Sequence, residues 1–322
     1  MNKDTLFNAV LAATGGKVYV KYNVNGDPLY MVRIPKFNVE DLDPTLGSGV
    51  HPAFVVDGVI KNEIFIGAYQ AIFEKGYAIS IPGCSPKVSI NFDQAKAACT
   101  ANGPGFHLMT NWEWAAVALW CLKNGFQPRG NTNYLKSHAA PYETGTPAPD
   151  NPTAKTLGGS GPVSWRHDNS IAGIADLVGN VWEWQDGFKI VDGKVYMPVD
   201  NDFNLAEANW PNPTGAQVIF PASSASESGW RTMATTFGSL SDAVKKQLAQ
   251  AMIVPNITSG NTPLTIFSQA KGGFWITAEG ERFPIRGGAW SDGASAGVAS
   301  LSLSTARSNV YTGFGCRAAF IV

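Results

Sequence analysis

The sequence lacks the patterns that mark several large classes of protein. It contains no run of Lys or Arg and has a formal net charge of −1, whereas a nucleic-acid partner requires clustered cations to neutralise its phosphates. No apolar run reaches the length of a membrane span, and the opening MNKDTLFNAVLAATGG has no apolar core typical of a signal peptide. We therefore expect a soluble protein, made in the cytoplasm without Sec export, with no nucleic-acid partner and no membrane insertion.

Cysteine and histidine are scarce as well. The cysteines are far apart and none belongs to a CxxC pair: Cys84, Cys99, Cys121 and Cys316. We expect buried thiols rather than a disulfide framework or a zinc site. The histidines have no Cys or Ser partner at a recognisable spacing: His51, His107, His138 and His167. We expect each of them to be a satisfied loop residue rather than a catalytic base.

Glycine, proline and aromatic residues are abundant instead. The 322 residues include 34 Gly, 20 Pro and ten Trp, and 44% are hydrophobic, which favours a loop-rich α+β protein packed around large rings. Without an internal repeat or a low-complexity linker, we expect one domain over residues 1–322. Within it we expect an N-terminal hairpin extension (1–50), a large insertion (185–285) with one short helix (241–252), and a distinct C-terminal segment (286–322).

Local patterns predict strands in the first part of the chain and loops after them. Residues 17–34 alternate apolar and polar side chains around an Asn-Gly pair, which predicts a β-hairpin. Residues 51–73 contain two further apolar strands with a turn at an Asp-Gly pair. Residues 128–172 are rich in Pro, Gly and Asn and predict long ordered loops.

Two helix starts carry capping signals. Asn91 is followed three residues later by Gln94, and Thr110 is followed at the same distance by Glu113, which is the capping-box pattern. The second helix is expected to end before Gly125, a residue type that commonly stops helices.

The stretch Gly-Asn-Val-Trp-Glu-Trp (residues 179–184) places a carboxylate between two large rings. A carboxylate in such surroundings requires hydrogen-bond donors or a cation. One interpretation is a core turn in which Glu183 accepts backbone N–H bonds. The other is a hard-cation site, because Asp176 and Glu183 bracket a Gly-containing turn whose carbonyls could complete an oxygen shell for Ca²⁺.

Three motifs in this order resemble the formylglycine-generating, sulfatase-modifying factor family. They are HLMTNWEWAA (107–116), GNVWEW (179–184) and RGGAW (286–290), and a PxGN-like loop (128–131) and a Gly-Cys-Arg ending (315–317) accompany them. The resemblance covers about residues 60–184 and 286–320. It implies an α+β, C-type lectin fold with the elaboration of the formylglycine-generating enzyme, loop-rich, with a large insertion before the C-terminal strands.

The catalytic residues of that family have no counterpart in this chain. Its enzymes use a pair of copper-binding cysteines five residues apart, shortly after the RGGSW-like motif. The matching positions are Asp292 and Gly297, and neither can supply a thiolate for copper. We therefore expect no copper and no enzymatic activity of this kind.

The family also binds calcium through a stretch similar to DLVGNVWE. Carried over by position, Asp176 and Glu183 would bind Ca²⁺ by their side chains, and Gly179 and Val181 by their carbonyls, as a structural site. A second calcium site of the family is in doubt because Ser164 stands where an Asp is expected. The sugar-binding triplets of true C-type lectins are absent, so the fold does not by itself indicate carbohydrate recognition.

The C-terminal segment resembles a non-enzymatic branch with the same fold, the variable proteins of diversity-generating retroelements. The pattern is RGGxWxxGAxAGVxxLxLxxARSNxxxxxGxRAAF. In that branch, adenine-directed mutagenesis of Asn-type codons rewrites the x positions, and it cannot produce Lys, Glu, Gln, Met or Trp. From Arg286 to Arg317 the only residue of these types is Trp290, a scaffold position.

The resemblance implies a hypervariable surface for ligand or receptor binding. Fourteen residues are expected to form one mostly exposed patch: Ala289, Ser291, Asp292, Ser295, Ala299, Ser300, Ser302, Ser304, Thr305, Val310, Tyr311, Thr312, Gly313 and Cys316. Five residues are expected to lie beneath it: Trp290, Val298, Leu301, Leu303 and Arg307. The division follows the two-residue period of a strand, in which leucines and serines face opposite sides.

The expected partner is a variable protein or glycan on a cell surface. The resemblance places such a protein on a phage or other virion, where it attaches to a host-surface target; some members of the branch are displayed on cells instead. An enzyme of the formylglycine-generating family with a different, non-copper site is the alternative. A deep pocket lined with titratable residues would favour that enzyme, and an exposed polar patch would favour the binding protein.

Overall fold

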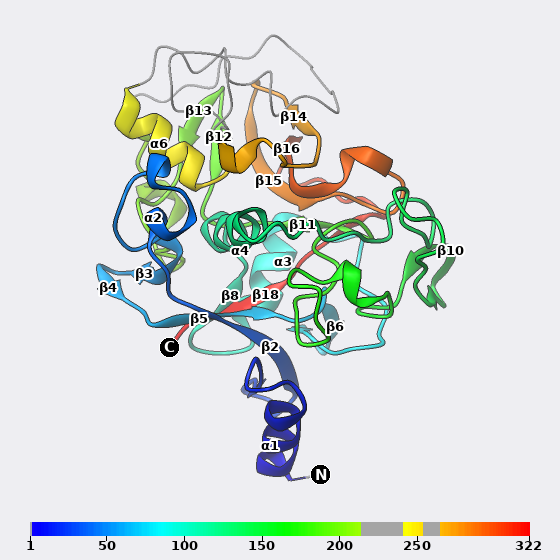
Figure 1. The fold of residues 1–322 in the computed structure, drawn as a ribbon. Coiled ribbons are helices and arrows are strands. Elements are labelled where there is room, and N and C mark those ends of the chain that lie inside the picture. The colour runs from blue at the N-terminus through cyan, green and yellow to red at the C-terminus, as the bar shows by residue number, and fades with distance from the viewer. Residues whose placement is uncertain (1, 214–240, 254–264) are drawn as a thin grey trace.

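A computed structural model of the protein describes residues 2–213, 241–253 and 265–322 (Figure 1). The expected insertion (185–285) includes residues 214–240 and 254–264, which lie outside the described residues. The described chain is mixed α+β with long connecting loops, which confirms the predicted class. In the described residues, no helix is both long and apolar enough to cross a membrane.

One sheet has five strands in the order β1-β2-β5-β18-β8. The predicted N-terminal hairpin is confirmed: β1 (Val18–Tyr22) pairs antiparallel with β2 (Pro28–Pro35). Strand β2 then pairs with β5 (Glu63–Gly67). The last strand of the chain, β18 (Ala318–Phe320), lies between β5 and β8 (Phe106–Leu108), so the C-terminus is held in the interior of this sheet.

The second sheet carries the C-terminal segment. Its seven strands follow the order β13-β12-β15-β11-β17, and β14 and β16 extend it from β15. Their bounds are β11 (Trp182–Trp184), β12 (Lys189–Val191), β13 (Lys194–Tyr196), β14 (Phe274–Ile276), β15 (Glu281–Gly287), β16 (Gly297–Thr305) and β17 (Phe314–Gly315). The sequence patterns did not predict β12, β13 and β14, because three-residue strands are too short to show a period.

Three two-stranded ladders and two short helices complete the strands and loops. The ladders pair β3 (Val55–Val56) with β4 (Val59–Ile60), β6 (Ile72–Glu74) with β7 (Tyr77–Ile79), and β9 (Pro147–Ala148) with β10 (Asn151–Thr156). The short helices are α2 (Val39–Leu42) and α6 (Asp242–Gln250). The β3-β4 turn falls on the predicted Asp-Gly pair, and α6 matches the helix expected at 241–252.

Both capped helices form as predicted. In α3 (Phe92–Thr100) and α4 (Asn111–Lys123), the capping boxes of Asn91 with Gln94 and of Thr110 with Glu113 are present. Gly125 follows the end of α4 with φ +72°, a value that favours glycine. An eleven-residue N-terminal helix, α1 (Lys3–Ala13), was not predicted. Its apolar side chains, Leu6, Phe7, Val10 and Leu11, are at helical spacing and are partly exposed. The ring of Phe7 contacts Tyr19 of β1, so this face of the helix packs on the hairpin and was overlooked in the sequence.

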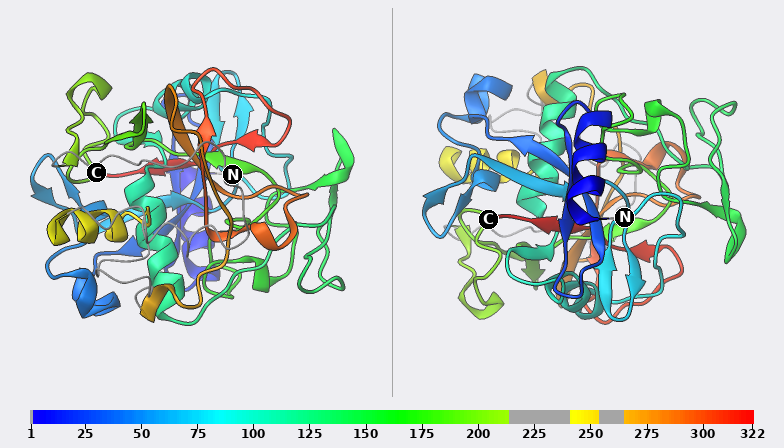
Figure 2. Two further views of the ribbon diagram at one scale, coloured as in Figure 1. Left: turned by 90° about the horizontal axis from the view of Figure 1, so that it is seen from above. Right: turned by 90° about the horizontal axis from the view of Figure 1, so that it is seen from below.

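Helix α4 lies at the centre of the larger hydrophobic core. Eleven of its 13 residues are buried, and Leu301 and Leu303 of β16 belong to the same core cluster. Four tryptophans are almost fully buried: Trp112, Trp114, Trp165 and Trp184. Strands β14, β15 and β16 lie at the end of the molecule opposite α1 (Figures 1 and 2), whereas β18 returns to the sheet that contains β1 and β2.

Candidate functional site

The C-terminal segment starts from a buried arginine that joins two helices. Arg286 has no exposed surface. It donates from Nε and Nη2 to Oδ1 of Asn111 at the start of α4, at 3.1 and 2.7 Å. The same Nη2 donates to the carbonyls of Ala251 and Met252, just after α6, at 3.3 and 3.1 Å. Burial lowers the pKa of Arg286 to about 9. The end of β15, where the RGGAW motif begins, is therefore held in place by contacts with both helices.

The two glycines after Arg286 are required by space and by backbone geometry. Gly287 and Gly288 both have φ +92°, and a Cβ on them would lie 2.5 Å from the Leu177 carbonyl oxygen and 2.6 Å from the Ala296 Cβ. No other residue type fits both constraints. The chain therefore makes a tight turn at these two glycines.

Residues 289–296, which we name the Trp290 turn, follow these glycines. The Asp292 carboxylate accepts the Ala289 N–H at 2.7 Å and a hydrogen bond from the Trp182 side chain. Burial raises the pKa of Asp292 above its usual range despite these bonds. Its side chain is therefore used mainly to hold the turn together.

Residues 306–313, which we name the Arg307 loop, are anchored at their start. Arg307 forms ion pairs with Asp93 at 2.6 Å and with Glu207 at 3.2 Å, and its guanidinium lies 5.1 Å from the ring centroid of Phe283. Beyond this anchor, the loop exposes Val310 and Tyr311, which are 53% and 64% accessible. The loop presents these side chains from a backbone that is fixed by charge and stacking.

The Trp290 turn and the Arg307 loop lie side by side. The ideal Cβ position of Gly313 is 3.6 Å from the Ala289 Cβ and 3.7 Å from the Trp290 ring. The next residue, Phe314, pairs with Trp182 in register in the parallel β11–β17 ladder. The two segments thus form one surface, which we name the C-terminal surface.

The structure divides the fourteen residues expected on this surface. Four are exposed: Ser291, Val310, Tyr311 and Thr312. Three are partly exposed: Asp292, Ser295 and Ser304. Seven are buried: Ala289, Ala299, Ser300, Ser302, Thr305, Gly313 and Cys316. The expectation of one mostly exposed patch is wrong for these seven, and target binding by the other seven stays a prediction.

The burial of the serine face has a clear cause. Strand β16 is an interior strand, with β14 on one edge and β15 on the other. Ser302 lies in register between Trp275 and Ile285, both of which belong to or pack against the second core cluster. The alternation was predicted correctly, but the strand pairs on both edges and both of its faces are covered. Cys316 is buried against the thiol of Cys99.

The scaffold residues behave largely as expected. Val298, Leu301 and Leu303 are buried in the core that contains α4. Trp290 and Arg307 are partly exposed rather than beneath the surface. Tyr134 also lies at this surface, which its sequence neighbourhood did not predict. It is 54% exposed, and its backbone N–H donates to the Trp290 carbonyl at 2.8 Å. Tyr134 comes from a distant loop, and only the fold brings it to this surface.

The GNVWEW turn is organised by one amide group. Gln70 is almost fully buried, and its Nε2 donates to the carbonyl oxygens of Asp176 and Val181 at 3.1 and 3.0 Å. The same nitrogen lies 3.4 Å from the Gly179 carbonyl oxygen and 3.0 Å from Oε1 of Glu183. We name these four oxygens the oxygen cage. They come from the four residues that the family resemblance assigned to calcium.

The orientation of the Gln70 amide is fixed by a second bond. Its Oε1 accepts from Nδ2 of Asn180 at 3.0 Å, and Oδ1 of Asn180 in turn accepts the Thr156 N–H at 2.9 Å. A flipped amide would place two donors against each other. The nitrogen therefore faces the oxygen cage.

Besides the neutral Gln70 amide, Glu183 has a positively charged partner, Arg317. Arg317 donates to both carboxylate oxygens, from Nε at 2.9 Å and from Nη2 at 2.7 Å, and both side chains are buried. The interpretation of a core turn had Glu183 accept backbone N–H bonds. Its donors are instead the side chains of Arg317 and Gln70. The buried carboxylate is satisfied by a bidentate ion pair.

Calcium binding at the oxygen cage stays a prediction. The Gln70 nitrogen already stands within hydrogen-bond distance of the oxygens that would surround the ion. Oδ2 of Asp176, expected as a ligand, accepts the Gly159 N–H at 2.7 Å, whereas its Oδ1 is buried without a hydrogen-bond partner. The carbonyl of Asp176 belongs to the cage. Among the described residues, no three His, Cys, Asp or Glu side chains are placed to hold a metal ion.

Three of the four histidines have partners that account for their positions. His51 Nδ1 accepts the Ala53 N–H at 3.2 Å, His107 Nε2 lies 2.8 Å from Glu113, and His138 Nδ1 lies 2.8 Å from the Thr132 hydroxyl. The expectation that these residues are satisfied is confirmed for the three, but His107 lies in β8 rather than in a loop.

Comparison with known proteins finds solved structures with low sequence identity to this chain. No protein-family model matches the chain, and no curated protein is similar to it. The Major Tropism Determinant P3c variant aligns over 91% of this chain and 63% of its own length, at 13% identity with a TM-score of 0.35. The U1 variant aligns over the same shares at 12% identity with a TM-score of 0.34. The chain thus spans less than two thirds of the length of these determinants.

A third solved structure is covered almost completely. Treponema denticola variable protein 1 aligns over 94% of this chain and 98% of its own length, at 14% identity with a TM-score of 0.37. These neighbours are variable proteins of the kind that the C-terminal pattern resembles. At such TM-scores the likeness carries no argument of its own, and the interpretation of the site rests on the geometry above.

Proposed function

We propose that the chain is a non-enzymatic binding protein whose C-terminal surface recognises a target that differs among variants. The observation that carries the proposal is the Arg307 loop: an anchored backbone that exposes Val310, Tyr311 and Thr312 beside the Trp290 turn. A rigid aromatic side chain surrounded by small polar ones is the composition of adaptable binding loops. Substitution at exposed positions costs little stability, so these positions can vary without loss of the fold.

The finer assignment of the fold is part of the same proposal. We assign a C-type lectin fold of the formylglycine-generating type because the motifs that suggested it meet in space. Arg286 of RGGAW binds Asn111 of the HLMTNWEWAA helix, and Glu183 of GNVWEW binds Arg317 of the Gly-Cys-Arg ending. Motifs that are remote in sequence thus depend on one another for their buried hydrogen bonds.

The alternative of an enzyme finds no support at the positions where the family places its chemistry. Asp292 holds the Trp290 turn. At Gly297 a Cβ would lie 2.0 Å from the Lys271 carbonyl oxygen, so the backbone there has no room for a cysteine.

The proposed setting is a phage or other virion, and the proposed target is a protein or glycan on a host cell surface. This setting rests on the sequence resemblance. Since the surface has few aromatic residues, a single copy would bind modestly, and multivalent display would raise the avidity.

Binding is tested with fluorescently labelled protein, coupled in several copies to beads, on cells from the source community. We expect a subset of cells to be labelled in flow cytometry, and Tyr311→Ala to reduce that labelling. Tyr142→Ala is the matched control, because Tyr142 is 83% exposed and lies in the loop region of residues 128–172. Equal loss of labelling for both variants, or none for either, would contradict a binding role for the C-terminal surface.

Diversification is tested by deep sequencing of this gene from its source population. We expect substitutions to concentrate at adenines in codons for the exposed and partly exposed residues of the Trp290 turn and the Arg307 loop. Codons for Leu301 and Leu303 should remain constant. Substitutions spread evenly along the gene would refute diversification by a retroelement while leaving the binding role open to the cell-labelling experiment.

A further inference from the structure

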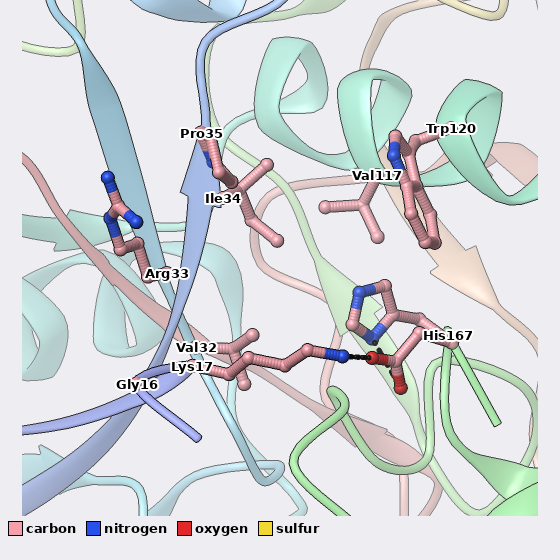
Figure 3. Close-up of a pocket in the computed structure, with 10 residues that line it drawn as sticks. Gly16, Lys17, Val32, Arg33, Ile34, Pro35, Val117, Trp120 and His167 are labelled. Atoms are coloured by element: carbon pink, nitrogen blue, oxygen red, sulfur yellow. Dashed lines mark hydrogen bonds and ion pairs between the residues drawn. The ribbon is translucent and has the colours of Figure 1, made fainter. Parts of the chain in front are cut away.

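A cavity of about 250 Å³ lies between the N-terminal hairpin and α4 (Figure 3). None of the residues that line it belongs to residues 286–322, so it is separate from the C-terminal surface. Neither the family resemblance nor the proposed function uses it.

The walls of the cavity are apolar and come from two rigid elements. Val32 and Ile34 line it from β2, and Val117 and Trp120 line it from α4 (Figure 3). The Trp120 ring is held by stacking on Phe126, with centroids 5.6 Å apart. A preformed apolar cavity between fixed elements is the usual form of a small-molecule site.

The charged groups around the cavity are paired with one another. Lys17 Nζ lies 2.9 Å from the Asp168 carboxylate, and Arg33 forms an ion pair with Glu63. No formal charge on these residues is left for a ligand to balance. The cavity therefore favours a neutral occupant, because a charged molecule would lose its hydration without gaining a counter-ion.

One polar group inside the cavity has no partner. His167 Nδ1 accepts the Ile174 N–H at 2.8 Å, which places the ring proton on Nε2. Among the described residues, none hydrogen-bonds to that Nε2, although the side chain is only 6% exposed. The ring points into the cavity, facing Ile34 and Val117 (Figure 3). Since burial lowers the pKa of His167 to about 4, the ring stays neutral near pH 7 and acts there as a donor.

We propose that this cavity binds a small neutral molecule with a branched or aromatic apolar body and one hydrogen-bond acceptor, which His167 Nε2–H receives. The site is one for binding rather than catalysis. Because His167 Nδ1 already accepts a backbone N–H, the ring cannot act as a base through that atom, and no Ser, Cys or Thr is among the lining residues.

The proposal is tested by ¹⁹F NMR titration of the full chain with three probes of one shape. These are 4-fluoroacetophenone, which has a carbonyl acceptor, 4-fluorotoluene, which has none, and 4-fluorobenzoate, which is charged. We expect saturable binding of the acetophenone, with affinity about 2- to 10-fold above that of the toluene, as one neutral hydrogen bond provides. The benzoate should bind no more tightly than the toluene.

Two variants assign the binding to this cavity. His167→Phe keeps a flat ring but removes the donor, so it should abolish the preference for the acetophenone while the toluene still binds. Val117→Phe fills the cavity and should weaken both probes; its folding is checked by circular dichroism, and His167→Phe remains informative if it fails to fold. No saturable binding, a preference that survives His167→Phe, or tightest binding of the benzoate would each overturn the proposal. Self-association that Val117→Phe abolishes, without probe binding, would assign the cavity to a second copy of the chain instead.

Discussion

The side chain of Gln70 places a single amide nitrogen within hydrogen-bond distance of the four oxygens of the oxygen cage. Gln70→Leu should lower the free energy of unfolding by about 1–3 kcal/mol, because it leaves buried acceptors without a donor. The comparable change Gln269→Leu, at an exposed glutamine, should remain within about 0.5 kcal/mol. Urea denaturation of the three proteins measures the difference.

The same amide predicts how the protein responds to calcium. Because the Gln70 nitrogen occupies the space between the four oxygens of the cage, neither added calcium nor a chelator should shift the Tm of the wild-type protein. A Tm that falls on chelation and recovers with calcium would show that an ion displaces the amide, and would restore the calcium interpretation for Asp176 and Glu183.

The ion pair between Glu183 and Arg317 is buried on both sides. Arg317→Met should destabilise the protein by about 3–5 kcal/mol, because it leaves a carboxylate buried without its cation. The double variant Arg317→Met/Glu183→Gln should lose less unfolding free energy than the sum of the losses in the two single variants. The difference, which is the coupling energy of the pair, should be about 0.5–3 kcal/mol. The surface pair of Arg33 and Glu63 is the control, and its coupling should stay below about 1 kcal/mol. Equal coupling in both pairs would contradict this account.

At the scale of elements, β16 contributes mainly to the stability of the fold, and the Arg307 loop mainly to the proposed binding surface. Leu303 has no exposed surface, and Leu303→Ala should lower the free energy of unfolding by about 2–5 kcal/mol through lost burial and a residual cavity. Tyr311→Ala, at a side chain that is 64% exposed, should change it by no more than about 0.5 kcal/mol. Urea denaturation of the two variants and the wild type measures both changes in unfolding free energy. A large loss for Tyr311→Ala would show that the loop belongs to the core rather than to a binding surface.

The elements that sequence patterns could predict are those whose signals are local. The hairpin of β1 and β2 and the capped helices α3 and α4 form where the turn and capping residues indicate. Strands β12, β13 and β14 gave no such signal, because each has three residues and is defined by its pairing partners. The exposure of β16 could not be predicted for a related reason. Alternation shows which side chains share a face, but only the tertiary fold shows that both faces are covered.

At the scale of the whole molecule, the parts of the candidate site that escaped prediction are contacts between distant segments. Tyr134 reaches the Trp290 turn from a loop more than 150 residues earlier in the chain. Gln70 reaches the oxygen cage from the segment after β5. Neither residue has a distinctive neighbourhood in the sequence. The motifs themselves were recognisable because each has local requirements for glycine or for a buried ring, as Gly287 and Gly288 show.

Acid should destabilise the whole molecule through its buried neutral histidines. Burial lowers the pKa of His51 and of His167 to about 4, whereas an exposed histidine titrates near 6.5. Between these values the unfolded chain binds more protons than the folded one, so the stability contributed by the neutral rings is fully present above about pH 6.5 and is lost as the pH falls to about 4. Each ring should contribute up to about 1.4 kcal/mol per pH unit in this window. Urea denaturation from pH 4 to pH 8 gives the slope of the unfolding free energy against pH for the wild type, for His51→Phe and for His167→Phe.

Other buried groups also titrate in this range. The buried carboxyls of Asp176 and Asp186, whose pKa burial raises, bind protons in the folded state and act in the opposite direction, but they are common to all three proteins. The difference in slope between each variant and the wild type therefore isolates one histidine, and slopes that coincide for all three would show that neither ring is held neutral.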